Sequence, residues 1–372
     1  MMRFLTLETF GRTGGVQMVC RSMARALAEI SFQQDSFEMV SLCDKPEDLD
    51  QPYLASTLCR GFGYRRLAFV QYVLSKVWST RIVVLAHVNL IGLAWLMKLL
   101  APGIRIILLA HGKEVWARLP RWKQRFMARQ IEVWAVSRYT RMKLIDQQGV
   151  HPSRIKLLPN CLDPFFEIPE VFNKPATLLE RYNLNVTQKI MLSICRMTEF
   201  EHDKGYDLVL DVLPEIILHF PELVYLLAGS ISAKERVRLS SKIRTLGVES
   251  HVILPGFIED EELADYHMLA DVFVLPSSKE GFGLVFIEAA VCGTQIIAGN
   301  KDGSRDAVLD GRLGKLVNPT SRKEMLSAIM QYLKEEYQVS LAKERQSLAV
   351  SNFSFERYQS NIKQLLKQKP AP

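Results

Sequence analysis

One short segment in the second half of the chain combines two carboxylates with two glycines, in the order Glu280-Gly-Phe-Gly283-Leu-Val-Phe-Ile-Glu288. An apolar run ends just before it, and the residues from Phe282 onward have a helical pattern. Glycines at a helix start expose backbone N–H groups that can bind phosphate or sugar oxygens. About 12 Å of helix rise separates the carboxylates, so they suit opposite ends of one elongated ligand. The structural alternative makes Glu280 a helix-entry charge and Glu288 a surface residue.

Two cations follow another apolar run, in the order Ser193-Ile-Cys-Arg196, then Lys204-Gly205 eight positions later. A helical pattern begins directly after them. Arg offers a planar fork of donors and Lys a point charge, so cations beyond the end of a parallel strand predict a clamp for a diphosphate. A solvated loop with ordinary surface charges is the alternative.

A third loop, Gly11-Arg-Thr-Gly-Gly15, lies between a predicted strand and a predicted helix near the N-terminus. Glycines there let backbone N–H groups approach an anion at the helix start. A simple chain reversal explains the loop equally well. It is not a G-x-G-x-x-G motif, and no acid follows at the spacing of a nicotinamide site.

The elements that must position these loops alternate between strands and helices, which predicts βαβ units and parallel sheets. Expected strands in the first half are Phe4–Leu7, Glu38–Leu42, Ile82–Ala86, Ile104–Ala110, Glu132–Val136 and Ile155–Leu158, with a helix at Val16–Ile30. Those in the second half are Lys189–Ile194, Val224–Ala228, Val252–Leu254, Val272–Leu275 and Gln295–Ala298, with helices at Tyr206–Phe220, Ala233–Leu246, Asp260–Leu269 and Phe282–Cys292. Ligands of such sheets bind beyond the carboxyl ends of the strands, where all three loops fall.

The predicted fold class is therefore α/β, with two Rossmann-like domains whose parallel sheets face across a cleft. The expected boundaries are residues 1–166 for the N-terminal domain and 167–350 for the C-terminal domain. Residues 351–372 are expected to form a C-terminal helix that packs back on the first domain. At 372 residues the chain is too long for one ordinary α/β core.

Composition narrows the class of protein. The six cysteines are scattered without metal-ligand spacing, which is typical of reduced cytosolic thiols. No signal peptide is recognised at the N-terminus. The apolar stretch Ile82–Leu100 is interrupted by His87, Asn89 and Lys98, so a strand followed by a helix is favoured over a membrane span. The predicted location is the cytoplasm, and peripheral association with the inner face of the plasma membrane stays open.

Charge is divided unequally along the chain. Residues 1–165 hold 23 Lys and Arg against 12 Asp and Glu, whereas the remainder holds 24 against 28. Two segments, Gly61–Arg81 and Arg118–Arg129, carry cations and aromatic residues without any acid. They suit an anionic bilayer surface, and a solvated basic face explains them equally well. No nucleic-acid-binding motif accompanies them, so nucleic acid is not an expected partner.

At these residues the chain resembles the retaining GT-B glycosyltransferases of family four, also called glycosyl transferases group 1. The E-x7-E signature matches Glu280 and Glu288, and Arg196 with Lys204-Gly205 matches the diphosphate-binding pair. The loop between that pair is a few residues longer than the commonest form. Gly14-Gly15 matches the N-terminal glycine loop, Ala110-His111-Gly112 the histidine motif, and Val252–Ile258 the strand and turn beside the base.

The resemblance implies a role for each matching position. Arg196 and Lys204 would neutralise the diphosphate, Glu288 would bind the ribose, and Glu280 the transferred sugar. His111 would line the sugar pocket, and Phe257 would lie beside the base. Backbone amides would contact sugar and phosphate at Phe282, Gly283 and Leu284, and Gly14 and Gly15 complete the donor site. The segment Asp302–Asp306 stands where many relatives carry a Glu, and it receives no role.

The expected function is transfer of a hexose from a UDP- or GDP-linked sugar to a saccharide or lipid-linked acceptor, with retention and without a metal or other cofactor. A D-x-D sequence, Asp48-Leu-Asp50, is interpreted as an acidic surface loop. Two other classes stay open: a GT-B epimerase or phosphorylase, and a nucleotide-sugar-binding protein without catalysis.

Overall fold

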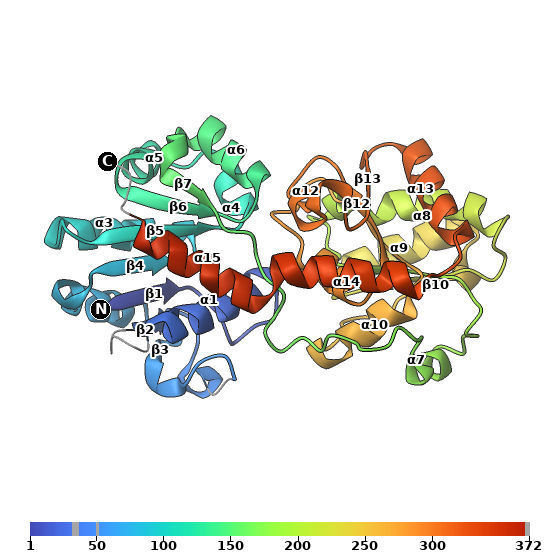
Figure 1. Ribbon diagram of the computed structural model, residues 1–372. Coiled ribbons are helices and arrows are strands. Elements are labelled where there is room, and N and C mark those ends of the chain that lie inside the picture. The colour runs from blue at the N-terminus through green and yellow to red at the C-terminus, as the bar shows by residue number, and fades with distance from the viewer. Residues whose placement is uncertain (32–36, 50–51, 369–372) are drawn as a thin grey trace. The chain divides into compact units, whose positions relative to one another are not determined.

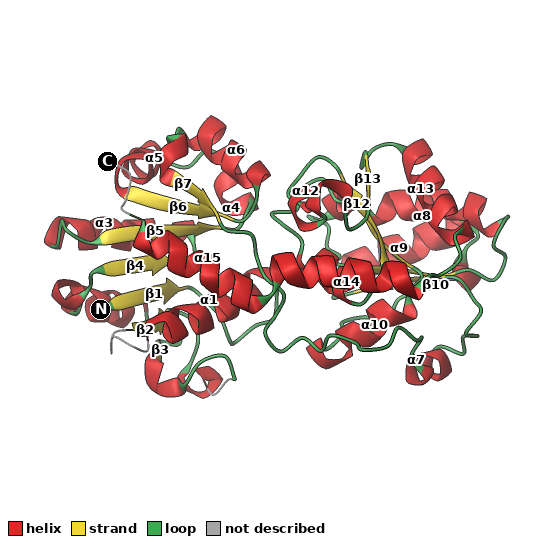
Figure 2. Ribbon diagram, viewed as in Figure 1, coloured by secondary structure: helices red, strands yellow, loops and turns green. Residues whose placement is uncertain are grey.

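The computed structural model describes residues 1–31, 37–49 and 52–368, and these divide into two compact units (Figure 1). The first unit contains Met1–Pro164 and the C-terminal segment from Phe353. The second unit is Phe165–Asn352. Each unit has one sheet of parallel strands with helices on its faces (Figure 2).

The sheet of the first unit has seven strands in the order β3-β2-β1-β4-β5-β6-β7. Its strands are β1 (Met2–Thr6), β2 (Phe37–Ser41), β3 (Cys59–Gly61), β4 (Ile82–Leu85), β5 (Arg105–Ala110), β6 (Ile131–Ala135) and β7 (Ile155–Leu157). Six of these strands are predicted from apolar runs. The sequence prediction misses β3, which has three residues at the edge of the sheet and none that is fully buried.

Both faces of this sheet are covered, because alternate strand residues point to opposite sides. On one side Leu5, Val83 and Ile106 pack with α2 (Arg66–Ser75), α3 (Ile91–Leu100), α5 (Arg121–Gln130) and α6 (Arg138–Gln148). On the other side Phe4, Val84 and Ile107 pack with α1 (Gly15–Ser31) and α15 (Phe355–Lys367). The result is a three-layer unit.

Helix α15 joins the first unit although it comes last in the sequence. Its buried face, which includes Tyr358, Ile362 and Leu365, belongs to the same core as α1. At its end, Arg105 donates to the carbonyl oxygens of Leu366 at 2.7 Å and Leu365 at 3.1 Å. These bonds satisfy carbonyl groups that a helix end leaves without partners.

The second unit has a six-stranded sheet in the order β10-β9-β8-β11-β12-β13. Its strands are β8 (Ile190–Ile194), β9 (Val224–Ala228), β10 (Val252–Ile253), β11 (Val272–Leu275), β12 (Gln295–Gly299) and β13 (Lys315–Val317). Its helices include α7 (Ala176–Arg181), α8 (Tyr206–Ile217), α9 (Ala233–Leu246), α10 (Leu263–Leu269), α11 (Leu284–Val291), α12 (Ser304–Ala307), α13 (Arg322–Lys334) and α14 (Val339–Phe353). The short edge strand β13 is missed by the sequence prediction.

The apolar stretch Ile82–Leu100 forms β4 and then, after one short turn, helix α3, as predicted. No helix in the described ranges is both long and apolar enough to cross a membrane. All six cysteines are free thiols.

Replacement of Ile362 by Ala tests whether α15 is part of the core of the first unit. Ile362 is fully buried, so the change should lower the free energy of unfolding by about 2–5 kcal/mol through lost burial and a residual cavity. Urea denaturation followed by circular dichroism measures it. The exposed neighbour Lys363→Ala is the control and should change stability by less than about 0.5 kcal/mol. Equal stabilities of the two variants would contradict the packing.

Candidate functional site

Two loops of the second unit meet at the carboxyl ends of neighbouring strands. One follows β8 and carries Lys204, and the other follows β11 and carries Glu280. The side chains form an ion pair, although 76 positions separate them in the sequence. Burial lowers the pKa of Lys204, but the Glu280 carboxylate more than offsets this and raises it overall. The structure therefore brings together two of the predicted site residues.

The backbones of the same two loops are also joined. The N–H of Ser278 donates to the carbonyl oxygen of Asp203 at 2.8 Å. Gly205 has a φ of +82°, and a Cβ atom there would lie 2.4 Å from the carbonyl oxygen of Pro276. Only glycine combines this conformation with so close an approach. The Lys204-Gly205 pair thus places a cation where the two loops touch.

Asp302, to which the sequence analysis gives no role, supports the Glu280 loop. Its carboxylate accepts the N–H of Glu280 at 2.6 Å, the hydroxyl of Ser277 at 2.8 Å and the N–H of Ser304 at 2.9 Å. The side chain is 2% exposed, and burial raises its pKa to about 6. Its partners lie 2 to 25 positions away, so no local pattern identifies it.

Arg196 lies in the loop after β8, and its guanidinium contacts Glu201. Nε and Nη2 donate to the two carboxylate oxygens at 2.5 and 2.8 Å. The side chain of Arg196 is 67% exposed, whereas that of Glu201 is largely buried. The arrangement leaves the guanidinium at the surface of the loop, beside a carboxylate that fixes its orientation.

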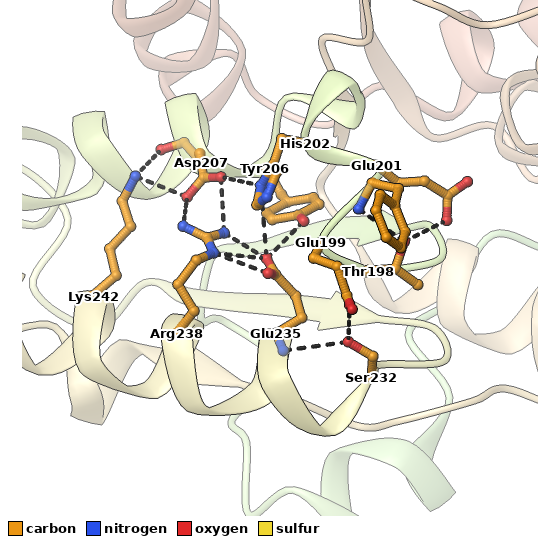
Figure 3. Close-up of polar contacts among 11 residues, drawn as sticks. Thr198, Glu199, Glu201, His202, Tyr206, Asp207, Ser232, Glu235, Arg238 and Lys242 are labelled. Carbon is orange, nitrogen blue, oxygen red and sulfur yellow. Dashed lines mark hydrogen bonds and ion pairs between the residues drawn. The ribbon is translucent and has the colours of Figure 1, made fainter.

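A polar network attaches the loop after β8 to helices α8 and α9 (Figure 3). Ser232 donates to Glu199 at 2.9 Å, and Nδ1 of His202 lies 3.4 Å from Asp207. Behind them, Arg238 bridges Asp207 of α8 and the buried Glu235 of α9. Burial would raise the pKa of Glu235, but hydrogen bonds from Arg238 and Tyr206 lower it overall. The longer form of the loop is therefore anchored at several points.

The start of α11 follows Gly283, so the amides of Phe282, Gly283 and Leu284 lie in its entry segment. Glu288 is in the second turn of the same helix. Its carboxylate lies 3.9 Å from Nε2 of His267, a fully buried side chain of α10. His267 is absent from the predicted site, because a lone His in a helix gives no signal in the sequence. Its ring nitrogens form no hydrogen bond among the described residues, so the contact with Glu288 is one of proximity.

Phe257 lies in the loop after β10, next to Gly256, which has a φ of +86°. The carbonyl oxygen of Gly256 accepts the N–H of Gly229, at the end of β9, at 2.7 Å. The aromatic side chain is half exposed. This places Phe257 beyond the carboxyl ends of the strands.

Gly14 lies between β1 and α1 of the first unit, and Gly15 is the first residue of α1. The preceding turn is held by Asp44, a buried residue that the sequence analysis does not single out. Its carboxylate accepts the N–H groups of Thr9, Phe10 and Gly11 at 2.9–3.1 Å. These three bonds hold the backbone of residues 9–11, at the start of the loop.

His111 follows β5 of the first unit and is almost fully buried. Its Nε2 lies 2.9 Å from the carbonyl oxygen of Ala86, and Nδ1 has no hydrogen-bond partner. Burial lowers the pKa of His111, and nearby Glu114 only partly offsets this. The ring is therefore neutral at pH 7, with the proton on Nε2. Nδ1 is then a buried hydrogen-bond acceptor.

The D-x-D sequence lies beside the glycine loop of the first unit, since a Cβ atom on Gly11 would lie 3.3 Å from Oδ2 of Asp48. Asp48 is in a short helical turn and accepts the N–H of Lys45 at 2.8 Å, while Asp50 lies outside the described residues. The second unit, in contrast, presents cations, carboxylates and helix-start amides at one edge of its sheet. That combination can bind a diphosphate and hydroxyl groups together.

Family models match both halves of the chain. Residues 177–353 match the model described as Glycosyl transferases group 1, and residues 13–165 match the model described as Glycosyltransferase Family 4. A GDP-mannose-dependent alpha-(1-6)-phosphatidylinositol monomannoside mannosyltransferase of Mycolicibacterium smegmatis is 32% identical over 238 residues. The match covers 60% of this chain and 60% of that protein. A D-inositol 3-phosphate glycosyltransferase of Xylanimonas cellulosilytica is 33% identical over 50% of this chain and 45% of its own length.

Solved structures with the same fold cover nearly the whole chain. The Anabaena protein HepE in complex with UDP has a TM-score of 0.79 at 18% identity, over 98% of this chain and 99% of that chain. Sucrose-phosphate synthase from Thermosynechococcus elongatus has a TM-score of 0.76 at 20% identity, over 99% and 98%. Likeness at this level of identity shows the fold. The predicted GT-B class, with two Rossmann-like units, is confirmed.

Asp302→Asn tests the buried carboxylate behind Glu280. The pKa of Asp302 is 3.8 in the unfolded chain and about 6 in the folded protein, so the folded state binds its proton more tightly. Its contribution to the free energy of unfolding is therefore greatest below pH 3.8 and decreases, by about 3 kcal/mol in all, as the pH rises through 6. The stability of the wild type relative to Asp302→Asn should fall over this window. Urea titrations across it measure the difference, and parallel pH profiles would contradict the assignment.

Proposed function

The chain belongs to the glycosyltransferases of group 1 and family 4, and we propose that it transfers a hexose from a nucleotide-diphosphate sugar to an acceptor hydroxyl, with retention at the anomeric carbon. The observation that carries this proposal is the contact of Lys204 with Glu280 at the strand ends of the second unit. A cation for the diphosphate and a carboxylate for the sugar must be neighbours, because one bond joins those parts of the donor.

In this proposal the remaining site residues divide the donor between them. Arg196 and the helix-start amides at Phe282–Leu284 bind the diphosphate with Lys204. Glu288 accepts hydrogen bonds from the ribose, and Phe257 lies beside the base. In the first unit, the proposed roles are contact with the phosphates for Gly14 and Gly15 and lining of the sugar pocket for His111.

The same groups account for the rate of the reaction. Cleavage of the bond between sugar and phosphate develops negative charge on the leaving oxygens and an oxocarbenium-like sugar. Fixed cations and amides stabilise that negative charge without reorganising. The acceptor attacks from the face that the phosphate leaves, and the departing phosphate oxygen takes the proton of its hydroxyl. We propose that no metal or other cofactor takes part.

For the donor we propose GDP-mannose, since the curated relatives include mannosyltransferases named as GDP-mannose-dependent. The chain spans about 60% of the length of the first of these relatives. UDP-glucose is the main competitor. A thermal-shift panel of sugar nucleotides ranks the donors, because a ligand that binds only the folded state raises its apparent stability. A larger shift with UDP-glucose would replace this assignment.

The acceptor we propose is lipid-linked, in glycolipid or polysaccharide synthesis at the cytoplasmic face of a membrane. Support comes from one side of the first unit, where the apolar helix α3 lies beside the basic helix α5. Exposed large apolar side chains on this side are Leu67, Trp78, Trp95, Leu96, Leu99, Leu100 and Trp122. Cations with exposed aromatic and aliphatic groups are typical of surfaces that contact anionic lipid.

Two other activities predict different outcomes. An epimerase would change the donor without any acceptor, and a phosphorylase would require phosphate. A binding protein would bind GDP or UDP without consuming the donor. Product analysis by NMR separates these cases from transfer, and the anomeric coupling of the product reports retention or inversion. An inverted product would contradict the proposed mechanism.

Lys204→Ala should lower kcat by about 100- to 1000-fold, which corresponds to the loss of one preorganised donor to the leaving group. The control is Lys323→Ala, an exposed lysine of α13 in the same unit, which should keep full activity. Because removal of Lys204 leaves Glu280 without its counter-charge, thermal unfolding of each variant is measured alongside turnover. A folded Lys204→Ala enzyme with unchanged kcat would remove Lys204 from the site.

A further inference from the structure

A basic recess lies in the first unit at the edge where its strands begin. It has a volume of about 220 Å³ and is formed at the amino ends of β5, β6 and β7 and the last turns of α3 and α5. Five cations and one acid line it: Lys98, Arg105, Arg129, Arg154, Lys156 and Glu132. Since a water molecule occupies about 30 Å³, the recess has room for a phosphate group with several waters.

Some of these cations have partners within the protein. Arg105 forms an ion pair with Glu132 at 2.8 Å as well as binding the end of α15. Lys98 donates to the carbonyl oxygen of Ile104 at 2.8 Å. Within the described part of the chain, Arg129 and Lys156 form no ion pair. Burial lowers the pKa of Lys98, and the charge of Arg154 lowers it further.

The carboxyl ends of nearby helices do not cancel the excess positive charge of the recess. Helices α3, α5 and α15 all end at this edge, and a helix carboxyl end carries about half a negative charge. Three such ends offset about 1.5 positive charges, whereas Lys98, Arg129 and Lys156 supply three beyond the Arg105–Glu132 pair. The recess therefore keeps a positive potential that attracts an anion.

The recess is separate from the residues assigned to sugar transfer. Arg105 begins β5, whereas His111 directly follows the end of that strand. Six residues of extended chain span about 20 Å. In Figure 2 the strands of this sheet point the same way, so the starts of β5, β6 and β7 share one edge and their ends the other.

Two exposed leucines follow a lining residue of the recess in the sequence. Leu99 and Leu100 complete α3 directly after Lys98, and they are 59% and 43% exposed. They continue the apolar surface of α3, where Trp95 and Leu96 are also exposed. A free phosphate ion would gain nothing from such neighbours, but a lipid would bury its hydrocarbon against them.

We propose that this recess binds the phosphate group of an anionic membrane lipid, while Leu99 and Leu100 enter the adjoining hydrocarbon. This contact would fix the orientation of the first unit on the bilayer. The inference deepens the membrane contact proposed above and does not depend on the identity of the donor.

The test compares two charge-reversed forms of the full-length protein. In the recess variant, Arg129 and Lys156 are both changed to Glu. In the control variant, Arg236→Glu and Arg244→Glu make the same change in net charge on exposed positions of α9. Co-sedimentation with phosphatidylcholine vesicles, with and without phosphatidylglycerol, measures lipid affinity. The recess variant should lose at least tenfold in affinity for anionic vesicles, because each cation near an anionic surface contributes about a fivefold effect. The control variant should lose less than about threefold.

A second pair of measurements separates lipid from free phosphate. Leu99→Ser with Leu100→Ser should weaken vesicle binding while leaving calorimetric binding of inorganic phosphate unchanged. The proposal is overturned if only the recess variant loses phosphate binding while all the proteins bind vesicles equally. That result would identify the recess as a site for a free anion. Equal vesicle affinity of the recess and control variants would also overturn the proposal. Turnover of a soluble acceptor is followed in parallel, so that failure of sugar transfer is distinguished from failure of lipid binding.

Discussion

The candidate site depends on one contact, in which two loops that follow adjacent strands are joined by the Lys204–Glu280 ion pair. Neither side chain is well solvated, so each needs the other as a counter-charge. The pair also sits on backbones that are already fixed, by the bond from Ser278 to Asp203 and by the carboxylate of Asp302. A charged pair held this way keeps its position when a ligand's charges arrive, which is what electrostatic stabilisation of a transition state requires.

Such close contact between loops depends on small residues in the backbone. A Cβ atom on Gly205 would meet the Pro276 carbonyl, and one on Gly303 would lie 2.0 Å from the carbonyl oxygen of Gly281. Both glycines lie next to a charged residue of the site, Lys204 in one case and Asp302 in the other. The glycines therefore allow three loops, after β8, β11 and β12, to share one small volume at the edge of the sheet.

Much of this arrangement follows from the sequence, because apolar runs identify the long strands and a parallel sheet brings strand ends together. Helix Ala233–Leu246 is predicted to the residue, since Ser232 caps it and Gly247 ends it. The edge strands β3 and β13 are too short to show alternation. Asp44, Asp302 and His267 are missed for another reason. Each acts on residues that are distant in the sequence or on another element, so its role exists only in the folded chain.

The excess of cations in the first half of the sequence corresponds to a structural feature of the first unit. Its sheet has two edges with different chemistry: the carboxyl edge carries the glycine loop and neutral His111, and the amino edge carries the basic recess. A solvated basic face would scatter its cations among polar residues, away from apolar surface. Here the cations gather around one recess beside exposed leucines of α3. Charge and apolar exposure at the same place favour contact with an anionic bilayer over simple solvation.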